Sequence, residues 1–319
     1  MPEKFCLKFY HSDMIRTVIL GADTPDAGEL IRILSMHPDI ELVCAQAYGK
    51  EGRALTSQHH GLIGETDLTF TTVPAPAKCN VVLDFSEHGE PAIVSKLAAA
   101  FPEARFIRLD RCQAPDDGNE WVYGLPEINR KALVRGTRFA AVPNSFASMA
   151  LVALYPLALH LLLNSDITLD IEAPQDIIDE TDIPAIEREI SEQLALAQTS
   201  FKGNVTVRTS LSNTRRTASL HLDLPCSLSL DELLKIYGMY EDHHFAFPVI
   251  MPVGPSEVAG TDKCVISLSK PDPDTLHIDA SADCRMRGAA GEAVHILNLM
   301  CGLHERTGLA LKAIDFHPI

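Results

Sequence analysis

The residue with the clearest chemical potential in this sequence is Ser145. A short apolar stretch, residues 139–142, ends at Pro143-Asn144, and a long apolar segment begins at Ser145. This pattern predicts a strand that runs into a helix, with Ser145 at the junction. In α/β enzymes such junctions hold nucleophiles and bound anions, because unpaired backbone N–H groups point there and the helix dipole favours negative charge. Ser145 is therefore the first candidate for a catalytic role.

A second candidate site lies in the first glycine turn. An apolar run over residues 17–20 ends in Gly21, a helical pattern covers residues 21–34, and a strand pattern covers residues 41–45. This order of elements opens a dinucleotide-binding fold. Only Gly21 and Gly28 of the usual glycine fingerprint are present, so a turn that binds nothing is an open alternative. The residues that would contact a cofactor in this turn are Gly21, Ala22, Asp23, Thr24 and Ala27.

Other reactive side chains give weaker signals. Lys50 follows the second strand and could attract a ribose 2′-phosphate, or could be an ordinary surface charge. The pair His59-His60 has no third ligand at a usable spacing, so we expect surface histidines and no metal site. Cys112 and Cys284 lie near segments expected to approach Ser145, but neither follows a strand-to-helix junction, and we expect ordinary buried thiols.

Composition limits the class of protein. The 319 residues suggest two domains, and the net charge of −16 argues against nucleic acid or an anionic membrane as a partner. The eight cysteines are scattered without a CxxC pair, which is typical of a reduced, cytoplasmic protein. The most apolar run, residues 149–163, is too short to span a bilayer and predicts a buried core helix. No secretory signal is visible.

The elements that must position these residues fall into two groups. In the amino-terminal half, strand patterns at residues 81–84 and 106–109 flank a helical pattern at 91–101, which predicts a mostly parallel, doubly wound sheet. The carboxy-terminal half predicts an α+β domain with a mixed sheet, and such exposed sheets often form dimer interfaces. Its strand patterns cover residues 166–171, 205–207, 218–224, 263–268 and 275–280.

The helices of this second half carry clear end signals. Asp182, with Pro184 in the first turn, is expected to be an N-cap, and Ser229 with Glu232 forms a capping box that opens a helix over residues 229–240. The last helical pattern, residues 288–300, begins with small residues that permit close approach of a ligand or of another backbone. Tight helix packing is the alternative for these residues. The two that we take as candidate cofactor contacts are Gly288 and Gly291.

Two long motifs and several short ones occur in a fixed order from Met14 onward. The long ones are Tyr123-Gly-Leu-Pro-Glu-Ile-Asn-Arg130 and Gly288-Ala-Ala-Gly-Glu-Ala-Val294. The short ones are Gly21-Ala22 with Gly28-Glu29-Leu30, His37-Pro38, His88-Gly89, Asn298-Leu-Met300 and Thr307-Gly-Leu309. Together they resemble the N-acetyl-γ-glutamyl-phosphate reductase family of arginine biosynthesis.

The resemblance implies a fold and a reaction. The fold is a Rossmann-type domain, residues 14–148 with the returning segment 288–319, plus an α+β substrate and dimerisation domain, residues 149–287; residues 1–13 would be a tail. The reaction is NADPH-dependent reduction of an acyl phosphate to a semialdehyde. A cysteine thiolate attacks the acyl phosphate, the thioester takes a hydride, and a histidine handles the proton. The resemblance also implies NADP as cofactor, a small-molecule substrate, and a homo-oligomer, either dimer or tetramer.

This sequence departs from the family at the reactive positions. Ser145 aligns with the cysteine nucleophile, and Glu180-Thr181-Asp182 replaces the region of the catalytic histidine, which leaves Asp182 as the candidate base. Thr24 and Ala27 stand where the family has glycines. Arg216 matches a family arginine and is carried over as a catalytic candidate, and His88 is carried over as a cofactor contact.

Three functional hypotheses follow from this pattern. The first is a degenerate member of the family that keeps the scaffold and has lost the reductase step. The second is an active NADP-dependent oxidoreductase of the same family with an altered mechanism or substrate, in which Ser145 positions the substrate and the hydride passes directly to a carbonyl. The third, hydrolysis with Ser145 as nucleophile, is the weakest, because no motif supplies a histidine.

Overall fold

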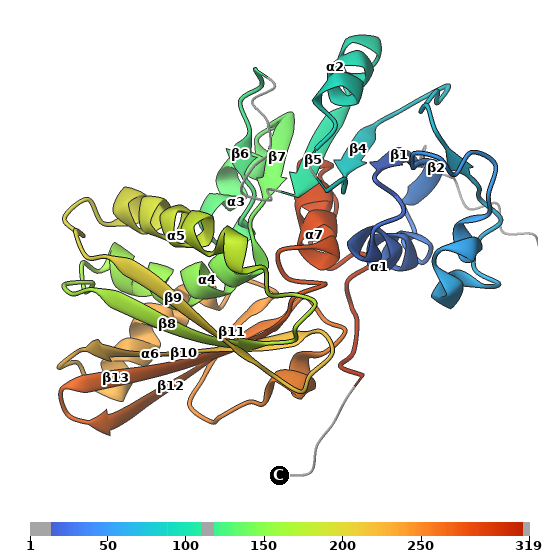
Figure 1. Cartoon of the computed structure of the whole chain (residues 1–319). Helices are drawn as coiled ribbons and strands as arrows, with labels where there is room; N and C mark the ends of the chain where they lie inside the picture. The colour runs from blue at the N-terminus through green and yellow to red at the C-terminus, as the bar shows by residue number, and fades with distance from the viewer. Residues whose placement is uncertain (1–13, 88, 110–117, 315–319) are drawn as a thin grey trace, which may run out of the picture.

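The first sheet is fully parallel and confirms the predicted doubly wound arrangement (Figure 1). The computed structural model describes residues 14–87, 89–109 and 118–314. The strands run in the order β3-β2-β1-β4-β5-β7-β6, so the order reverses between β1 and β4. Their bounds are β1 Ile15–Leu20, β2 Ile40–Gln46, β3 Phe70–Thr71, β4 Val81–Asp84, β5 Arg105–Leu109, β6 Val122–Tyr123 and β7 Phe139–Val142.

Helices cover both faces of this sheet because its strands are apolar on both sides. Ile19 and Leu83 pack in one core with α1 (Pro25–Leu34) and α7 (Ala290–Met300). The neighbouring residues Val18 and Val82 point the other way and pack in a second core with α2. The remaining helix of this part, α3 (Pro126–Val134), contributes Leu133 to the face of α1 and α7; α2 spans Pro91–Ala100.

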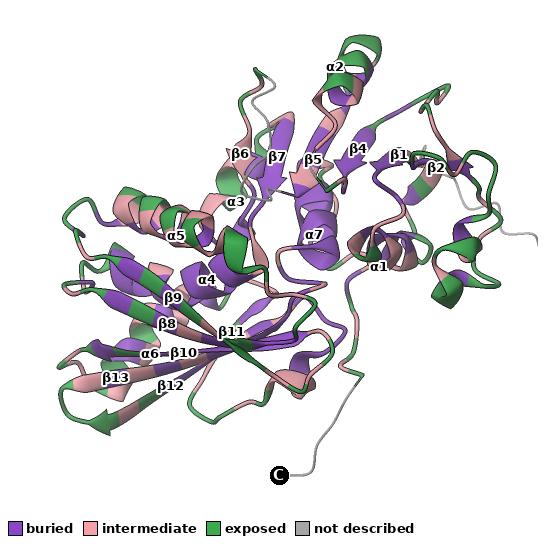
Figure 2. Cartoon of the chain, viewed as in Figure 1, coloured by how far each residue is buried: buried purple, intermediate pink, exposed green. Residues whose placement is uncertain are grey.

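The last helix returns to the first sheet after the chain has built the second one. α7 packs between α1 and α3 and is buried along its whole length, as its colour in Figure 2 shows. Glu305, just beyond it, accepts hydrogen bonds from Arg130 of α3 at 2.7 Å and pairs with His295 of α7 at 2.9 Å. Burial would raise the pKa of Glu305, but these two partners outweigh it and lower the pKa to about 2.

The second sheet is mixed, as predicted for an α+β unit, and the described α-helices that cover it pack on one face. Its order is β11-β12-β13-β10-β8-β9, with parallel pairs at both edges and antiparallel pairs between them. The strands are β8 Ile167–Ala173, β9 Val205–Leu211, β10 Thr217–Pro225, β11 Ala246–Val249, β12 Cys264–Asp272 and β13 Thr275–Asp283. The covering helices are α4 Ser145–Leu159, α5 Ile183–Ala197 and α6 Leu230–Tyr237.

The central helix α4 is the predicted core helix, although it begins at Ser145 and ends at Leu159 rather than covering residues 149–163. It is buried on nearly all sides because it lies between the second sheet and α5 (Figure 2). No helix in the described part of the chain is long and apolar enough to cross a membrane.

Two local expectations need correction. The motif over residues 123–130 contains the start of helix α3, which the sequence patterns did not indicate. Asp182 stands at the N-cap position of α5 with helical backbone angles, and its side chain makes no capping hydrogen bond there. The neighbouring Asp179 instead accepts hydrogen bonds from the backbone and hydroxyl of Thr181, which orders the turn before the helix. The capping box of Ser229 and Glu232 is confirmed.

Candidate functional site

Ser145 is the first residue of α4, and only Pro143 and Asn144 separate it from the end of β7. The side chain of Asn144 caps the helix and accepts a hydrogen bond from the backbone N–H of Phe146 at 2.8 Å. The Ser145 hydroxyl is half-buried and donates to the backbone carbonyl of Cys284 at 3.0 Å. The hydroxyl proton is therefore held by a peptide oxygen, which cannot act as a general base.

The segment before α7 lies directly against this serine. Gly288 has a φ of +67°, and a Cβ added there would lie 2.3 Å from the Ser145 Cα. Only glycine fits such a backbone conformation at such a distance. Gly291 is similarly tight, since an added Cβ would lie 2.7 Å from a carboxylate oxygen of Asp262. Both glycines thus allow close packing within the protein, which was the alternative to a ligand contact.

A pocket of about 320 Å³ opens beside Ser145 at the carboxyl edge of the first sheet. Ser145, Asp182 and Gly288 all line it, so the structure brings these three predicted residues together. The charged side chains that line it are Asp26, Asp176, Asp179, Asp182 and Arg285. These four carboxylates and one guanidinium give the lining a formal charge of −3.

Arg285 is the one basic side chain lining this pocket in the described part of the chain, and two carboxylates hold it. Its guanidinium lies 3.2 Å from Asp26 of α1 and 2.7 Å from Asp176. The sequence patterns did not single out this arginine. Because both pairs are partly exposed, Arg285 is positioned by them and only partly neutralised.

Cys284 lines the same pocket as Ser145, whereas Cys112 lies outside the described residues. Burial raises the pKa of the Cys284 thiol strongly, and the carboxylate of Asp283 raises it further. A thiol that stays protonated is a poor nucleophile, so Cys284 is an ordinary buried cysteine, as predicted. Among the described residues, no histidine lines the pocket of Ser145.

The first βα turn, between β1 and α1, is held by contacts with neighbouring loops. Gly21 has a φ of +64°, and its backbone N–H donates to the side chain of Gln46 at 3.1 Å. Thr24 caps α1 by accepting from the N–H of Ala27 at 3.2 Å. An added Cβ on Gly21 would lie 2.4 Å from Ser86, so the loops after β1 and β4 touch where the strand order reverses. Crevices at such reversals are where α/β folds bind ligands.

Side chains from residues 50–59 fold over this turn. Lys50 lies 2.9 Å from Asp23, so the structure places this cation beside the turn but pairs it with a carboxylate. Gln58 donates to the backbone carbonyl of Asp23 at 3.2 Å, and His59 lies 2.7 Å from the carbonyl of Ala22. His59 therefore has a structural role beside the turn. His88, another predicted cofactor contact, lies outside the described residues.

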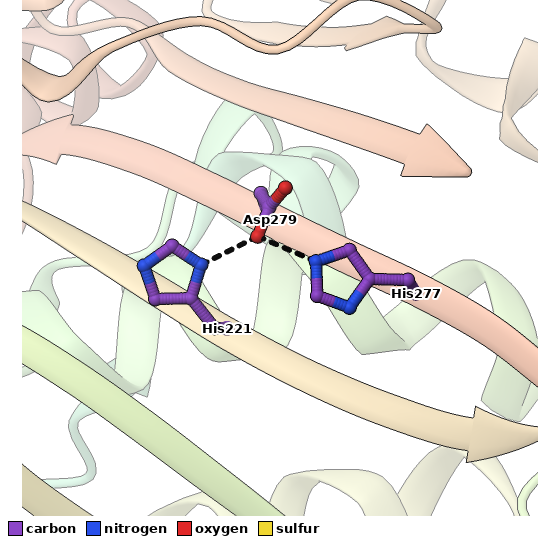
Figure 3. A group of neighbouring side chains, drawn as sticks. All are labelled: His221, His277 and Asp279. Atoms are coloured by element: carbon purple, nitrogen blue, oxygen red, sulfur yellow. Dashed lines mark hydrogen bonds and ion pairs between the residues drawn. The ribbon is translucent and has the colours of Figure 1, made fainter. Parts of the chain in front are cut away.

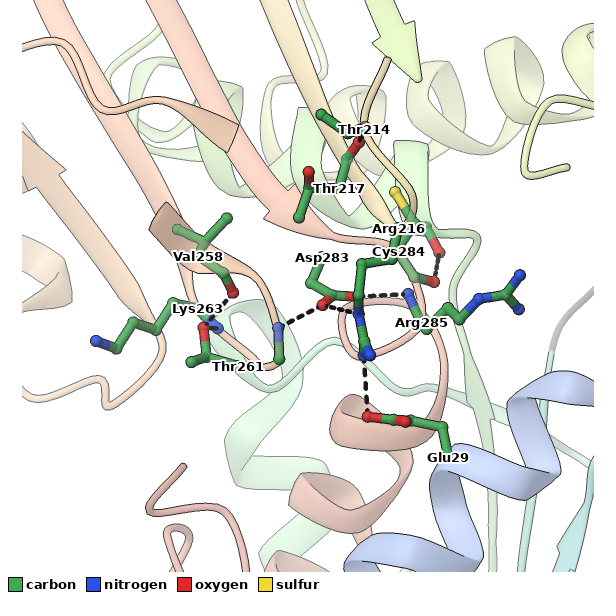
Figure 4. Close-up of polar contacts among 12 residues, drawn as sticks. Glu29, Thr214, Arg216, Thr217, Val258, Thr261, Lys263, Asp283, Cys284 and Arg285 are labelled. Carbon is green, nitrogen blue, oxygen red and sulfur yellow. Dashed lines mark hydrogen bonds and ion pairs between the residues drawn. The ribbon is translucent and has the colours of Figure 1, made fainter. Parts of the chain in front are cut away.

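Arg216 does not line the pocket of Ser145. It lies just before β10, pairs with Glu29 of α1 at 2.9 Å, and pairs with Asp283 at the end of β13 (Figure 4). Asp283 also accepts a hydrogen bond from the backbone N–H of Gly260 at 2.6 Å. Arg216 thus connects the first helix to the second sheet, and it lines a separate cavity on the other side of that sheet.

A buried ionic cluster lies behind Ser145 and was not found from the sequence. The fully buried guanidinium of Arg287 contacts Glu127 through two nitrogens, each at 2.8 Å, and donates to the hydroxyl of Ser148 at 2.8 Å. Glu292 accepts from Ser148 at 3.0 Å and from the N–H of Gly288 at 2.7 Å. The cluster therefore fixes the loop that packs on Ser145.

One cation in this cluster faces several carboxyl groups. Burial would raise the pKa of Glu127, but Arg287 outweighs it and holds that pKa below its usual value. Burial raises the pKa of Glu292 to about 7 and raises that of Asp262 well above its usual value. Both carboxylate oxygens of Asp262 are buried without a hydrogen-bond partner, which adds to the cost of ionising this carboxyl group.

Comparison with known proteins agrees with this architecture. Residues 16–135 match the family described as semialdehyde dehydrogenase, NAD binding domain. The chain is 32% identical over 326 residues to the N-acetyl-gamma-glutamyl-phosphate reductase of Parabacteroides distasonis, covering 95% of this chain and 100% of that protein. It is also 32% identical over 329 residues to the reductase of the same name from Flavobacterium johnsoniae, with the same coverage.

Solved structures show the same fold at low sequence identity. The aspartate semialdehyde dehydrogenase of Candida albicans, determined with NADP, superposes with a TM-score of 0.66 at 13% identity and covers 90% of this chain and 98% of its own. The enzyme II of that name from Vibrio cholerae gives a TM-score of 0.65 at 13% identity and covers 91% and 99%. Because the chain is 32% identical to two reductases of this name over their full length, it belongs to the N-acetyl-gamma-glutamyl-phosphate reductase family.

Proposed function

We propose that this chain is a catalytically degenerate member of its family that keeps the dinucleotide-binding scaffold and has lost acyl-phosphate reduction. The observation that carries the proposal is the environment of Ser145. Its hydroxyl donates to the Cys284 carbonyl, and the described pocket around it contains no histidine. An alcohol without a base ionises far less than a thiol, and loss of nucleophile and base together typically costs about 10⁶-fold in rate.

The charge of the pocket supports the same proposal. An acyl phosphate brings two negative charges, whereas four carboxylates and a single arginine line this space. Like charges at short distance repel, and Arg285 is already paired with Asp26 and Asp176. Asp182 supplies a carboxylate where the family resemblance implies a histidine. It is the candidate base, but it adds to the repulsion.

We further propose that the first βα turn still holds an NADP-type dinucleotide, which would supply a hydride when bound. The left-handed Gly21 and the amino end of α1 support a pyrophosphate site here, and Lys50, which lies beside this turn, would attract a 2′-phosphate. The residues that we assign to this site are Gly21, Ala22, Asp23, Thr24, Ala27 and Lys50, with His88 carried over from the family resemblance. The close contacts of Gly288 with Ser145 and of Gly291 with Asp262 favour a packing role for these two glycines. The closeness of Asp23 to Lys50 predicts weaker binding than a free lysine would give.

The second candidate function is an active NADP-dependent oxidoreductase with an altered substrate. The retained turn at Gly21 favours it, together with Arg216, which the Glu29 and Asp283 carboxylates hold in one position. In this reading Ser145 orients a carbonyl by hydrogen bonding, and the hydride passes to that carbonyl directly. A small-molecule substrate and a homo-oligomer, dimer or tetramer, are proposed under both readings.

The first experiment is a fluorescence titration of the purified chain with NADPH, with NADH alongside. We expect micromolar NADPH binding, weakened in a Lys50→Ala variant and unchanged in Lys202→Ala, which removes an exposed lysine far along the chain. No binding at millimolar cofactor would exclude both the dinucleotide site and the redox alternative, and would leave a scaffold whose function lies in its partners.

The second experiment measures phosphate-dependent reduction of NADP by N-acetylglutamate semialdehyde, with the Parabacteroides distasonis reductase as the positive control. We expect no turnover from this chain or from Ser145→Cys, because the thiol would still lack a histidine. Turnover by the unaltered chain comparable to that of the control would overturn the degenerate reading. If turnover appears and Ser145→Ala leaves it unchanged, a mechanism that uses the serine is excluded.

A further inference from the structure

The open face of the second sheet carries two histidines and an aspartate side by side. His221 on β10 pairs in register with Asp279 on β13, and His277 lies two residues before Asp279 on the same strand. Because side chains alternate along a strand, all three point away from the covering helices (Figure 3). Their partly exposed side chains come from segments that are far apart in the sequence.

The three side chains converge on one point. His221 Nδ1 and His277 Nε2 lie 2.5 Å and 3.0 Å from the same Asp279 oxygen, and the three ligand atoms all lie within 4.8 Å of one another. Two imidazole nitrogens and one carboxylate oxygen are a donor set suited to zinc and similar divalent transition metals, whereas calcium and magnesium prefer oxygen ligands alone.

The outer contacts of both rings favour metal binding. The remaining nitrogen of His277, Nδ1, lies 2.7 Å from the carboxylate of Asp223, and the remaining nitrogen of His221, Nε2, lies 3.2 Å from the hydroxyl of Ser219. Metal-bound histidines almost always bond through their second nitrogen to such an oxygen, which fixes the tautomer and the orientation of the ring. When Nδ1–H of His277 is donated to Asp223, Nε2 is the ring nitrogen that faces Asp279 and would bind the cation in place of a proton.

The site also has an open side. His221 and Asp279 line a cavity of about 960 Å³ whose wall includes Ser219, Ser281 and Glu172. This cavity is separate from the pocket of Ser145, because the two have no lining residue in common among the described residues. Three protein ligands with a fourth position open to a cavity are typical of zinc sites that bind water or an exogenous ligand.

We propose that His221, His277 and Asp279 form a divalent metal site that takes Zn²⁺, with an open coordination position facing this cavity. The site lies on the second sheet and uses no residue assigned to the dinucleotide or to the Ser145 pocket. The proposal is therefore independent of whether the reductase reaction survives.

The test is calorimetric titration of the full chain with ZnCl₂, after treatment with a chelator and desalting under reducing conditions. We expect one high-affinity ion per chain. His277→Asn and Asp279→Asn should each weaken binding by about 100-fold or more, and Asp223→Asn, which removes only an outer partner, by about 10- to 100-fold. The matched control is His60→Asn, which removes an exposed histidine elsewhere and should leave the affinity unchanged.

Cobalt substitution provides a second readout that does not depend on the stability of the variants. Co²⁺ at this site should give visible bands of nitrogen and oxygen coordination, without the intense near-ultraviolet bands of thiolate ligands. Wild-type protein that binds no Zn²⁺, one tight ion that persists in His277→Asn and Asp279→Asn, or thiolate bands with Co²⁺ would each overturn the proposal. Circular dichroism of each variant in chelator confirms that its fold is intact.

Discussion

Replacing the buried arginine behind Ser145 should destabilise the protein strongly. Arg287 is fully buried, and it contacts Glu127 at 2.8 Å and lies 3.6 Å from Glu292. Arg287→Met keeps most of the side-chain volume but leaves two buried carboxyl groups without a cation. Removing one partner of a buried ion pair typically costs about 3–5 kcal/mol, because the other charge stays desolvated.

The pH dependence of this loss follows from the direction of the pKa shift. Arg287 holds the folded-state pKa of Glu127 below its unfolded value, so the stability that this pair contributes is present above the unfolded pKa and is lost as pH falls. Without Arg287, Glu127 and Glu292 become neutral more readily in the folded state. The difference in unfolding free energy between wild type and Arg287→Met should therefore be largest near pH 8 and smaller near pH 5.

The assay is urea unfolding followed by circular dichroism at both pH values. A double variant, Arg287→Met with Glu127→Gln, should recover about 0.5–3 kcal/mol relative to the single variant, because the stranded charge is gone. Arg208→Met is the control, since it removes an exposed guanidinium paired with Asp170 and should not move the midpoint. A loss for Arg287→Met that is the same at both pH values, or no recovery in the double variant, would refute the reasoning.

Three further predictions concern backbone fit, acid stability and helix capping. Gly288→Ala and Gly49→Ala each place a side chain on a left-handed backbone, which should cost about 1–2 kcal/mol of stability in thermal unfolding. Gly288→Ala should cost about 1–3 kcal/mol more, because its Cβ would clash with Ser145, whereas a Cβ on Gly49 would meet no neighbouring atom. Glu305 has a folded-state pKa of about 2, so its contribution to the free energy of unfolding is complete above pH 4.5 and is lost as pH falls toward 2. In Glu305→Gln, the free energy of unfolding should therefore fall less steeply between pH 4.5 and pH 2 than in the wild type. Ser229→Ala should cost about 1 kcal/mol in urea unfolding by removing the N-cap of α6.

Much of the fold could be predicted because the residues within most helices and strands have the spacing or end signals of that element. The buried face of α5, formed by Ile186, Ile190 and Leu194, recurs at helical spacing, and the capping box marks the start of α6. The elements that were missed carry weak or contrary signals. β11 contains Pro248, which is tolerated only because β11 is an edge strand, and α3 carries a buried Glu127 and a non-helical Asn129.

The candidate site was less predictable because its geometry depends on distant segments. The family resemblance related Ser145 and Asp182, which do share a pocket, but no local pattern could show that Arg285 joins them there. Arg287 meets Glu127 across 160 residues, and His221 meets Asp279 across 58. Such long-range pairs cannot be predicted from the periodicity of apolar residues, because they form only when the sheets and helices have assembled.

The return of α7 to the first sheet has a consequence for the order in which the chain can fold during synthesis. Ala293, Val294 and Leu297 of α7 complete the core that Leu30 and Ile31 of α1 begin, although more than 250 residues separate the two helices in sequence. A ribosome-bound chain that does not yet include α7 leaves that apolar surface of the first sheet open. The core of the amino-terminal half is therefore complete only after the whole second sheet has been made, and exposed apolar surface of this kind is what chaperones bind.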